Sequence, residues 1–132
     1  MKYLLDANTW IKFLNGRSER VRQRLESTPP DQITLCAIVK AELVYGAIKS
    51  ARPAENLERI QTFTGNFVSF PFDDDAARIY GVLRTRLESV GKLIGPNDLL
   101  IAAIALARGA TLVTHNTREF ARVEGLILED WE

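Results

Sequence analysis

Three carboxylate residues stand in or beside apolar stretches of the sequence, where a charged side chain needs a specific reason to be present. Asp6 directly follows a short apolar run, Glu42 interrupts a longer one, and Asp98 immediately precedes another. A carboxylate on an otherwise apolar face must find a hydrogen-bonding partner or a cation. These three residues are therefore the first candidates for a functional site.

Each carboxylate also has a purely structural interpretation. Asp6 can cap a turn, and Asp98 can cap a helix or stabilise the positive end of the helix dipole. Glu42 lies in the middle of a predicted helix, where capping does not explain it. No lysine or arginine lies three or four residues from Glu42 to form an ion pair along that helix. Of the three, Glu42 is the strongest indication of a site.

Taken together, Asp6, Glu42 and Asp98 predict a site for a divalent metal ion. Clusters of carboxylate oxygens suit Mg²⁺ or Mn²⁺. Without a cation the like charges raise one another's pKa, and a bound divalent ion relieves that repulsion. Such an ion activates water and stabilises charge on a phosphodiester. Hydrolysis of a phosphodiester is the chemistry that these residues predict.

Other kinds of catalytic site are poorly represented in the sequence. His115 and Cys36 are the only histidine and the only cysteine, too few for a typical zinc site or for ribonuclease chemistry with two histidines. The sequence contains no glycine-rich phosphate loop and no nucleophilic serine motif. The acidic run 73–75 is better explained as the start of a helix than as a metal site.

The composition indicates a single globular domain over residues 1–132. Hydrophobic residues make up 46% of the chain, and 17 basic residues balance 17 acidic ones. Zero net charge argues against nonspecific polyanion binding as the whole function, without excluding a nuclease. The single cysteine allows no internal disulfide, and no apolar run is long enough to span a membrane. We therefore expect a cytoplasmic protein with no membrane partner.

Short apolar strands alternate with helices along the chain. The predicted strands are 3–5, 33–36, 67–70, 111–114 and 126–128. The predicted helices are about 10–14, 19–28, 38–50, 53–64, 74–90 and 97–108, with Thr9 and Ser18 capping the first two. This alternation predicts an α/β fold whose parallel sheet is covered by helices on both faces. Ligands bind such sheets beyond the carboxyl ends of the strands, which is where Asp6 and segment 114–120 would lie.

Four short motifs follow one another along the chain. They are Leu4-Leu5-Asp6-Ala7-Asn8-Thr9, Ile38–Ala47 around Glu42, Gly95–Ala102 around Asp98, and Leu112–Phe120. In this order they resemble the motifs of the PIN-domain family, and in particular those of the VapC toxins of VapBC toxin–antitoxin pairs of the enteric type. The match extends through nearly the whole chain, to the ending Glu129-Asp130-Trp131.

The resemblance implies a three-layer α/β/α fold and a Mg²⁺- or Mn²⁺-dependent endoribonuclease. Asp6, Glu42 and Asp98 would hold the metal, directly or through its waters. The enteric type implies initiator tRNA, cut in the anticodon stem-loop, as the RNA substrate. It also implies a homodimer and a cognate antitoxin whose tail covers the acidic site in a toxin–antitoxin hetero-oligomer.

The fourth motif departs from the family pattern at one position. Many PIN domains have an aspartate where this chain has Asn116, whereas Glu119 matches a second acidic position of the motif. We assign both residues to the catalytic site. Because asparagine is a neutral and weaker ligand, the substitution leaves open whether one or two metal ions bind. Thr9 and Thr114 are candidates to support the site through their hydroxyl groups, or are simply a cap and a strand end.

Two other functions remain open from the sequence. One is a noncatalytic PIN-fold module that binds RNA or protein, which Asn116 alone favours and the three retained carboxylates oppose. The other is a phosphohydrolase or receiver domain, although the residues after Asp6 lack the second acid that such aspartyl chemistry usually requires. Further hypotheses concern basic residues that could bind a phosphate backbone, or that simply form solvated helix faces. They also concern apolar residues that could form an antitoxin groove, or that simply belong to the core. These are Arg17, Arg20, Arg22, Arg24, Arg84, Arg86 and Lys92 for phosphate, and Trp10, Ile11 and Leu14 for the groove.

Overall fold

The computed structural model describes all residues from 1 to 132 and contains one five-stranded sheet. All strand pairs are parallel, and the strand order is β3-β2-β1-β4-β5. The strands are β1 (Tyr3–Leu5), β2 (Ile33–Cys36), β3 (Val68–Phe70), β4 (Thr111–Val113) and β5 (Leu128–Glu129).

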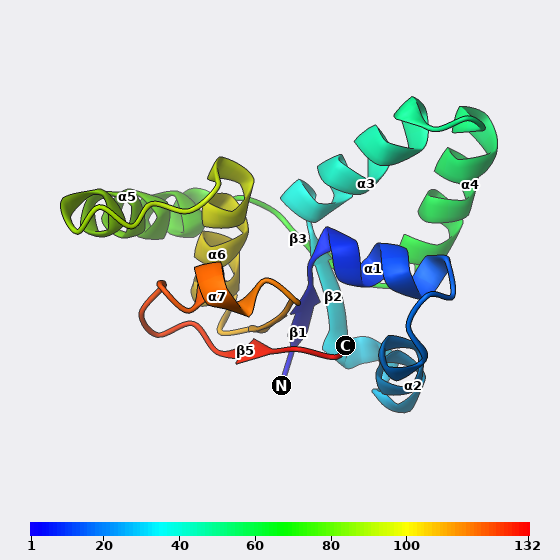
Figure 1. The fold of residues 1–132 in the computed structure, drawn as a ribbon, viewed down its shortest axis with the longest axis horizontal. Coiled ribbons are helices and arrows are strands. Elements are labelled where there is room, and N and C mark those ends of the chain that lie inside the picture. Colours follow the sequence, from blue (N-terminus) through cyan, green and yellow to red (C-terminus); the bar gives the residue numbers. More distant parts are fainter.

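Helices cover both faces of the sheet, as Figure 1 shows. Four helices lie on one side, α1 (Ala7–Leu14), α2 (Glu19–Ser27), α3 (Ala37–Lys49) and α4 (Pro53–Thr64). The other side carries α5 (Asp74–Ser89), α6 (Pro96–Arg108) and α7 (Thr117–Phe120), and a 3₁₀ turn, Pro30–Gln32, precedes β2. The prediction of a three-layer α/β/α fold around a parallel sheet is confirmed.

The core is built from the inner strands and the helices packed on them. All residues of β2 and β4 are buried, and α6 is buried along most of its length. Trp10 of α1 is completely buried and packs against Phe63 and Phe67, with ring centroids 5.8 and 5.3 Å apart. The prediction that Trp10 lines a partner groove is therefore wrong, because a fully buried side chain is not available to a partner. No helix combines the length and apolar character needed to cross a membrane.

The topology brings the candidate carboxylates to one edge of the sheet. Because the strands are parallel, the carboxyl ends of β1, β2 and β4 lie at the same edge. Asp6 follows β1, and α3, which carries Glu42, begins directly after β2. Helix α6 precedes β4 and returns across the sheet, so that its first turn, with Asp98, also lies at this edge. The carboxyl-terminal edge of the sheet therefore brings together carboxylate residues from distant parts of the chain.

The structure corrects three details of the predicted elements. The N-cap of α1 is Asp6 and not Thr9, because the Asp6 carboxylate accepts the backbone N–H of Thr9. The last strand lies at Leu128–Glu129, and not at residues 126–128. The short helix α7 had not been predicted, since a helix of four residues is too short to show a periodic apolar pattern. Ser18 caps α2 as predicted, with its hydroxyl accepting the Val21 N–H at 3.2 Å.

Candidate active site

Asp6 is the most firmly held of the candidate carboxylates. Its Oδ1 atom accepts the Thr9 N–H at 2.9 Å, which fixes the first turn of α1. Its Oδ2 atom accepts the Thr114 hydroxyl at 2.5 Å, and its own N–H donates to the Val113 carbonyl at 3.0 Å. The carboxylate is half-buried and each oxygen has one protein donor. The remaining lone pairs of both oxygens are free to meet a cation.

Thr114 links Asp6 to the fourth motif. It is fully buried, and its hydroxyl accepts the Asn116 N–H at 3.0 Å while donating to Asp6. The Asn116 side-chain amide in turn donates to Glu119 Oε2 at 2.7 Å. Because an ionised carboxylate only accepts hydrogen bonds, the single proton of the Thr114 hydroxyl is donated to Asp6. The hydroxyl oxygen still accepts the Asn116 N–H. Of the two interpretations of Thr114, the structure favours support of the site.

Glu42 projects from the second turn of α3 and is half-buried. Burial raises the pKa of the Glu42 carboxyl, and the nearby charges of Asp98 and Asp6 raise it further. Because the charges of both residues act on Glu42, the three carboxylates, distant in sequence, lie near one another in the fold. As expected from its helical neighbours, Glu42 has no basic partner.

Asp98 lies in the first turn of α6, whose N-cap is Gly95, and it does not cap the helix. Burial raises the pKa of the Asp98 carboxyl, and the charges of Glu119 and then Asp6 raise it further. A carboxylate that served only the helix dipole would have its pKa lowered, because the dipole favours the charged form. The raised pKa of Asp98 therefore has its causes in burial and in repulsion by the neighbouring carboxylates.

The four carboxylates of Asp6, Glu42, Asp98 and Glu119 form no ion pair, although most other acidic residues of the chain do. Half-buried carboxylates that repel one another and have no protein cation are suited to a divalent metal ion. No three of them bring oxygens within 4.8 Å of one another. Oxygens that bind one Mg²⁺ directly are about 3 Å apart, so three of these carboxylates, as they lie, would reach one ion only if some of the contacts ran through its waters.

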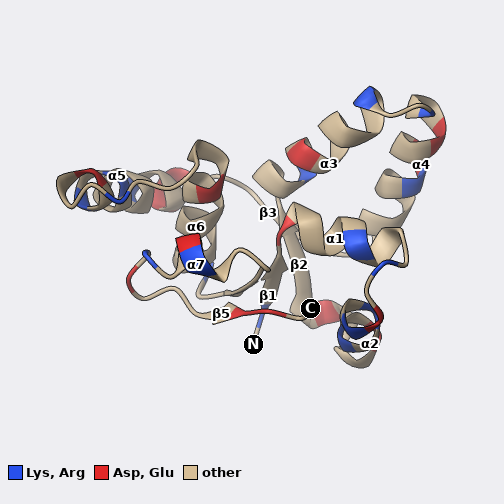
Figure 2. Ribbon diagram, viewed as in Figure 1, with Lys and Arg blue, Asp and Glu red and all other residues tan.

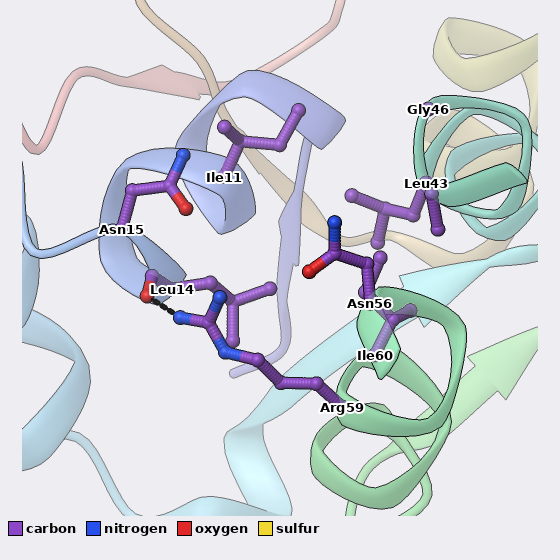
Figure 3. Close-up of a pocket in the computed structure, with 9 residues that line it drawn as sticks. Ile11, Leu14, Asn15, Leu43, Gly46, Asn56, Arg59 and Ile60 are labelled. Atoms are coloured by element: carbon purple, nitrogen blue, oxygen red, sulfur yellow. Dashed lines mark hydrogen bonds between the residues drawn. The ribbon is translucent and has the colours of Figure 1, made fainter. Parts of the chain in front are cut away.

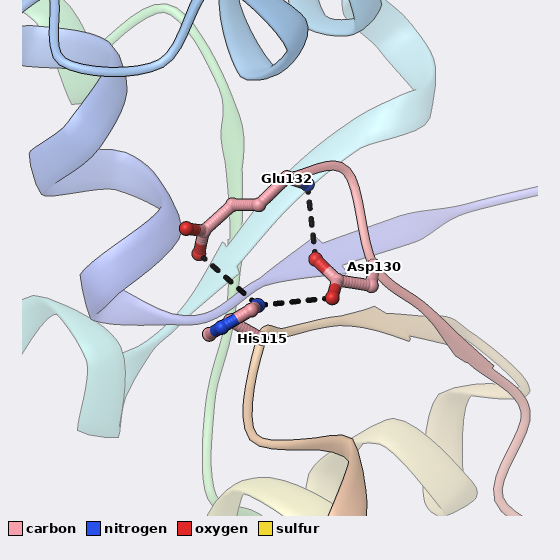
Figure 4. Close-up of side chains that lie close together, drawn as sticks. All are labelled: His115, Asp130 and Glu132. Carbon is pink, nitrogen blue, oxygen red and sulfur yellow. Dashed lines mark hydrogen bonds and ion pairs between the residues drawn. The ribbon is translucent and has the colours of Figure 1, made fainter.

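His115, Asp130 and Glu132 are the one set of potential ligands that lies within 4.8 Å (Figure 4). His115 Nδ1 is 2.9 Å from Asp130 Oδ2 and 3.9 Å from Glu132 Oε2. Lys12 of α1 already forms an ion pair with the Glu132 carboxylate. Trp131, the residue between Asp130 and Glu132 in the sequence, is buried. We interpret this set as the contact that fastens the C-terminal segment to α1. The His115 side chain keeps 66% of its surface exposed, as is usual for a surface residue.

Most of the arginines proposed to bind phosphate form ion pairs within the protein. Figure 2 shows basic and acidic residues interspersed along α2 and α5. Arg22 pairs with Glu19 and Glu26, and Arg24 pairs with Glu129. The second basic stretch is engaged in the same way, through the pairs Arg84–Glu88 and Arg86–Glu124. Arg17, Lys92 and Arg118 of α7 form no ion pair.

A groove with a volume of about 200 Å³ separates α1 from α3 and α4 (Figure 3). Ile11 and Leu14 of α1 face Leu43 and Ile60 across it, and Arg59 donates to the Leu14 carbonyl at one end. Ile11 keeps 39% of its surface exposed, so this side of α1 is incompletely covered by the chain itself. The predicted groove residues Ile11 and Leu14 do line an apolar groove.

The link from Thr114 to Asp6 leads to a testable prediction. Thr114→Val keeps the shape of the side chain but removes the hydroxyl, leaving Asp6 Oδ2 without a donor. We expect the affinity for Mn²⁺, followed by electron paramagnetic resonance, to fall about 10- to 100-fold, as is usual when a group that orients a ligand is lost. Thr114→Ser, which retains the hydroxyl, is the matched control and should bind Mn²⁺ like wild type. Unchanged Mn²⁺ binding by a folded Thr114→Val protein would contradict the role of Thr114.

Comparison with known proteins agrees with this architecture. The sequence profile of the PIN domain matches residues 3–126. Ribonuclease VapC2 of Rickettsia felis is 40% identical over 133 residues, covering 100% of this chain and 99% of that protein. The tRNA(fMet)-specific endonuclease VapC of Salmonella typhimurium is 36% identical and covers 99% and 98%. The crystal structure of DNA-bound VapBC from Salmonella typhimurium superimposes with a TM-score of 0.93 at 36% identity, over 100% of this chain and 99% of that one. The chain therefore belongs to the PIN-domain family and, within it, to the VapC proteins.

Proposed function

We propose that this protein is a divalent-metal-dependent endoribonuclease that acts as the toxin of a toxin–antitoxin pair. The observation that carries the proposal is the convergence of Asp6, Glu42 and Asp98 at one sheet edge without any protein cation. The names of the relatives supply the substrate class, since they are ribonucleases and a tRNA(fMet)-specific endonuclease.

In the proposed mechanism each carboxylate has a distinct position. Asp6 is oriented by Thr9 and Thr114 before any ligand arrives, so it is the fixed ligand of the set. Glu42 and Asp98, whose pKa values are raised, lose proton affinity when a cation joins them. Mg²⁺ or Mn²⁺ held by these residues would supply an activated water and neutralise charge on the phosphodiester.

Asn116 and Glu119 complete the proposed site. Their side chains are hydrogen-bonded to each other, and the charge of Glu119 acts on Asp98. Asn116, at the position where many PIN domains have an aspartate, thereby orients the carboxylate of Glu119. We infer that Glu119 contributes the fourth negative charge and that Asn116 positions it. None of the four carboxylates forms an ion pair with a basic residue of the chain, so a bound metal ion would supply the positive charge beside them for the scissile phosphate.

The substrate that we propose is initiator tRNA, cut in the anticodon stem-loop in the cytoplasm. The direct test incubates the purified protein with 5'-labelled, transcribed initiator tRNA over a range of Mg²⁺ and Mn²⁺ concentrations. The same reactions are repeated with unlabelled anticodon stem-loop RNA as a competitor. Cleavage at one position that stops in EDTA is expected. A noncatalytic binding module would bind the RNA without cutting it at any metal concentration, and this result would refute the proposed activity.

We also propose that an antitoxin of the VapB kind occupies the groove between α1, α3 and α4, and that the protein forms homodimers that assemble with it. Solved relatives are VapBC complexes, and the groove is apolar along Ile11, Leu14 and Ile60. The neighbouring gene is expected to encode a small protein with a DNA-binding N-terminal part and an arginine in its tail. Such an arginine would neutralise the acidic site.

A charge introduced into the groove tests this partner site. Ile11→Asp places a carboxylate at a position that is already 39% exposed, so the fold should tolerate it. We expect antitoxin binding, measured by isothermal titration calorimetry, to weaken at least about tenfold, because the docked apolar surface would bury an unpaired charge. RNA cleavage without antitoxin should stay at the wild-type rate. Ile127→Asp, at an exposed position outside the groove, is the control; equal weakening by both variants would argue against this groove.

A further inference from the structure

A stripe of side chains along α3 leads away from the acidic site. Ile38, Glu42, Tyr45 and Lys49 are four, three and four residues apart, so they share one face of the helix. The buried residues Val39, Leu43 and Ala47 belong to a different face. From Glu42 the stripe continues to Lys49 over about 10 Å of helix. Going outward from the site it presents a carboxylate, an aromatic ring and a cation.

Tyr45 and Lys49 contact each other on the exposed face of α3, and neither side chain is part of the buried core. Tyr45 keeps 63% of its surface exposed and belongs to none of the aromatic contacts of the core. The Lys49 ammonium lies 5.5 Å from the centre of the Tyr45 ring, and it forms no ion pair. Because the ring stays this exposed with Lys49 in place, it offers surface to a further planar group.

We propose that Tyr45 and Lys49 form a binding site for an unpaired nucleotide of the RNA, with the base stacked on the Tyr45 ring and the adjoining phosphate at Lys49. Aromatic side chains stack on unpaired bases whatever the base, and an accompanying cation binds the phosphate. The site lies one helical turn beyond Glu42, so a strand bound there is directed toward the metal site. This inference rests on the proposed ribonuclease function and adds to it a preference for unpaired RNA.

Single-stranded RNA accounts for these residues better than a protein partner does. A protein interface at this face would cover an unpaired ammonium, which is costly unless the partner supplies an anion. A nucleotide supplies both an aromatic face and a phosphate in a fixed relation to each other. The apolar groove between α1, α3 and α4 has the opposite character, and no residue of the stripe lines it. The two surfaces of α3 are therefore suited to different occupants.

The experiment measures binding of fluorescein-labelled anticodon stem-loop RNA by fluorescence anisotropy in Ca²⁺, beside cleavage of the same RNA in Mn²⁺. We expect Tyr45→Ala to weaken binding about 5- to 100-fold, whereas Tyr45→Phe, which keeps the ring, stays within about twofold of wild type. A fully duplex RNA of equal length should be bound equally by all three proteins, because its bases are not available for stacking. Lys49→Ala should lower the slope of log affinity against log salt by about 0.7.

Two controls remove residues outside the stripe, one matched to Tyr45 in exposure and one matched to Lys49 in type and helix. Val82→Ala removes an exposed side chain from α5, and Lys40→Ala removes the other lysine of α3, which lines a cavity facing α4. Both should bind the stem-loop like wild type. If wild type cuts the RNA and Tyr45→Ala binds it equally well, this inference is overturned and the proposed function stands. A Tyr45→Ala protein that changes its mass in solution, by light scattering, would also overturn it in favour of a protein interface. Failure of wild type to bind or cut any RNA overturns both.

Discussion

Asp6→Asn is expected to reduce RNA cleavage at least about 100-fold while leaving the fold intact. The substitution removes one of the charges available to the metal, and losses of about 10²- to 10³-fold are typical when a group that stabilises developing charge is removed. Asparagine retains a side-chain oxygen for the Thr9 N–H, so the N-cap of α1 persists. Cleavage is measured with initiator tRNA in saturating Mn²⁺, and stability is measured by thermal melting in EDTA.

The same variant should relieve growth arrest in cells. Expression of the wild-type protein without an antitoxin is expected to stop growth, whereas Asp6→Asn and Asp6→Ala should allow it at equal protein level. Asp6→Ala also removes the N-cap, which costs about 1 kcal/mol, so only Asp6→Asn separates the loss of the site from a loss of stability. Asp74→Asn, at an exposed carboxylate in the first turn of α5, is the control and should remain toxic. Continued arrest by soluble Asp6→Asn would count against the proposed site.

Much of the fold could be predicted because local patterns determine it. The continuous apolar run of β2 marks a buried parallel strand, and Ser18 and Asp73 mark helix starts where the structure has N-caps. Helix α6 ends at Gly109, whose positive φ of 62° favours glycine. In each of these elements the decisive interaction lies within a few residues along the chain, so the sequence contains it.

The details that escaped prediction depend on contacts between distant segments. The position of β5 follows from its pairing with β4, in which Leu128 is opposite Leu112. The role of Thr114 depends on the register of β4 against β1: Leu5 is opposite Val113, so the residue after each strand, Asp6 and Thr114, come side by side. Sequence could nominate the hydroxyl but not its partner. Sequence could nominate Glu42 as a candidate site residue because its helical neighbours offer neither a cap nor an ion pair.

Asp98→Asn is the variant that separates a metal site from a helix terminus. It keeps the shape of the side chain and removes one of the repelling charges. Because the pKa of Asp98 is raised in the folded protein, its ionised form destabilises the metal-free fold. We therefore expect the variant to lose cleavage yet melt at an equal or higher temperature than wild type in EDTA. A residue that only complemented the helix dipole would give a loss of about 0.3 to 1 kcal/mol.

The pH dependence of stability follows from the same shift. At a pH well below about 3.9, the usual pKa of an aspartate, the Asp98 carboxyl is protonated in both folded and unfolded chains, so the variant and wild type should differ least. As the pH rises from there to the raised pKa of the folded state, the unfolded chain ionises first, and wild type loses stability. The advantage of Asp98→Asn in EDTA should therefore grow over this window and stay constant above it. An advantage that does not change with pH would exclude the proposed charge repulsion.

Metal ions should reverse the order of the two proteins. With a dissociation constant near 1 mM and about 10 mM Mg²⁺, binding to the folded state alone stabilises wild type by about 1.4 kcal/mol. Asp98→Asn lacks one charged ligand and should gain much less from the same addition. Melting curves in EDTA and in Mg²⁺, read beside cleavage of the same tRNA, give both results on one preparation. A variant that melts lower than wild type in EDTA and still cuts RNA would refute the role of Asp98 in metal binding. Such a result would mean that removing the Asp98 charge neither relieves repulsion in the metal-free protein nor impairs cleavage.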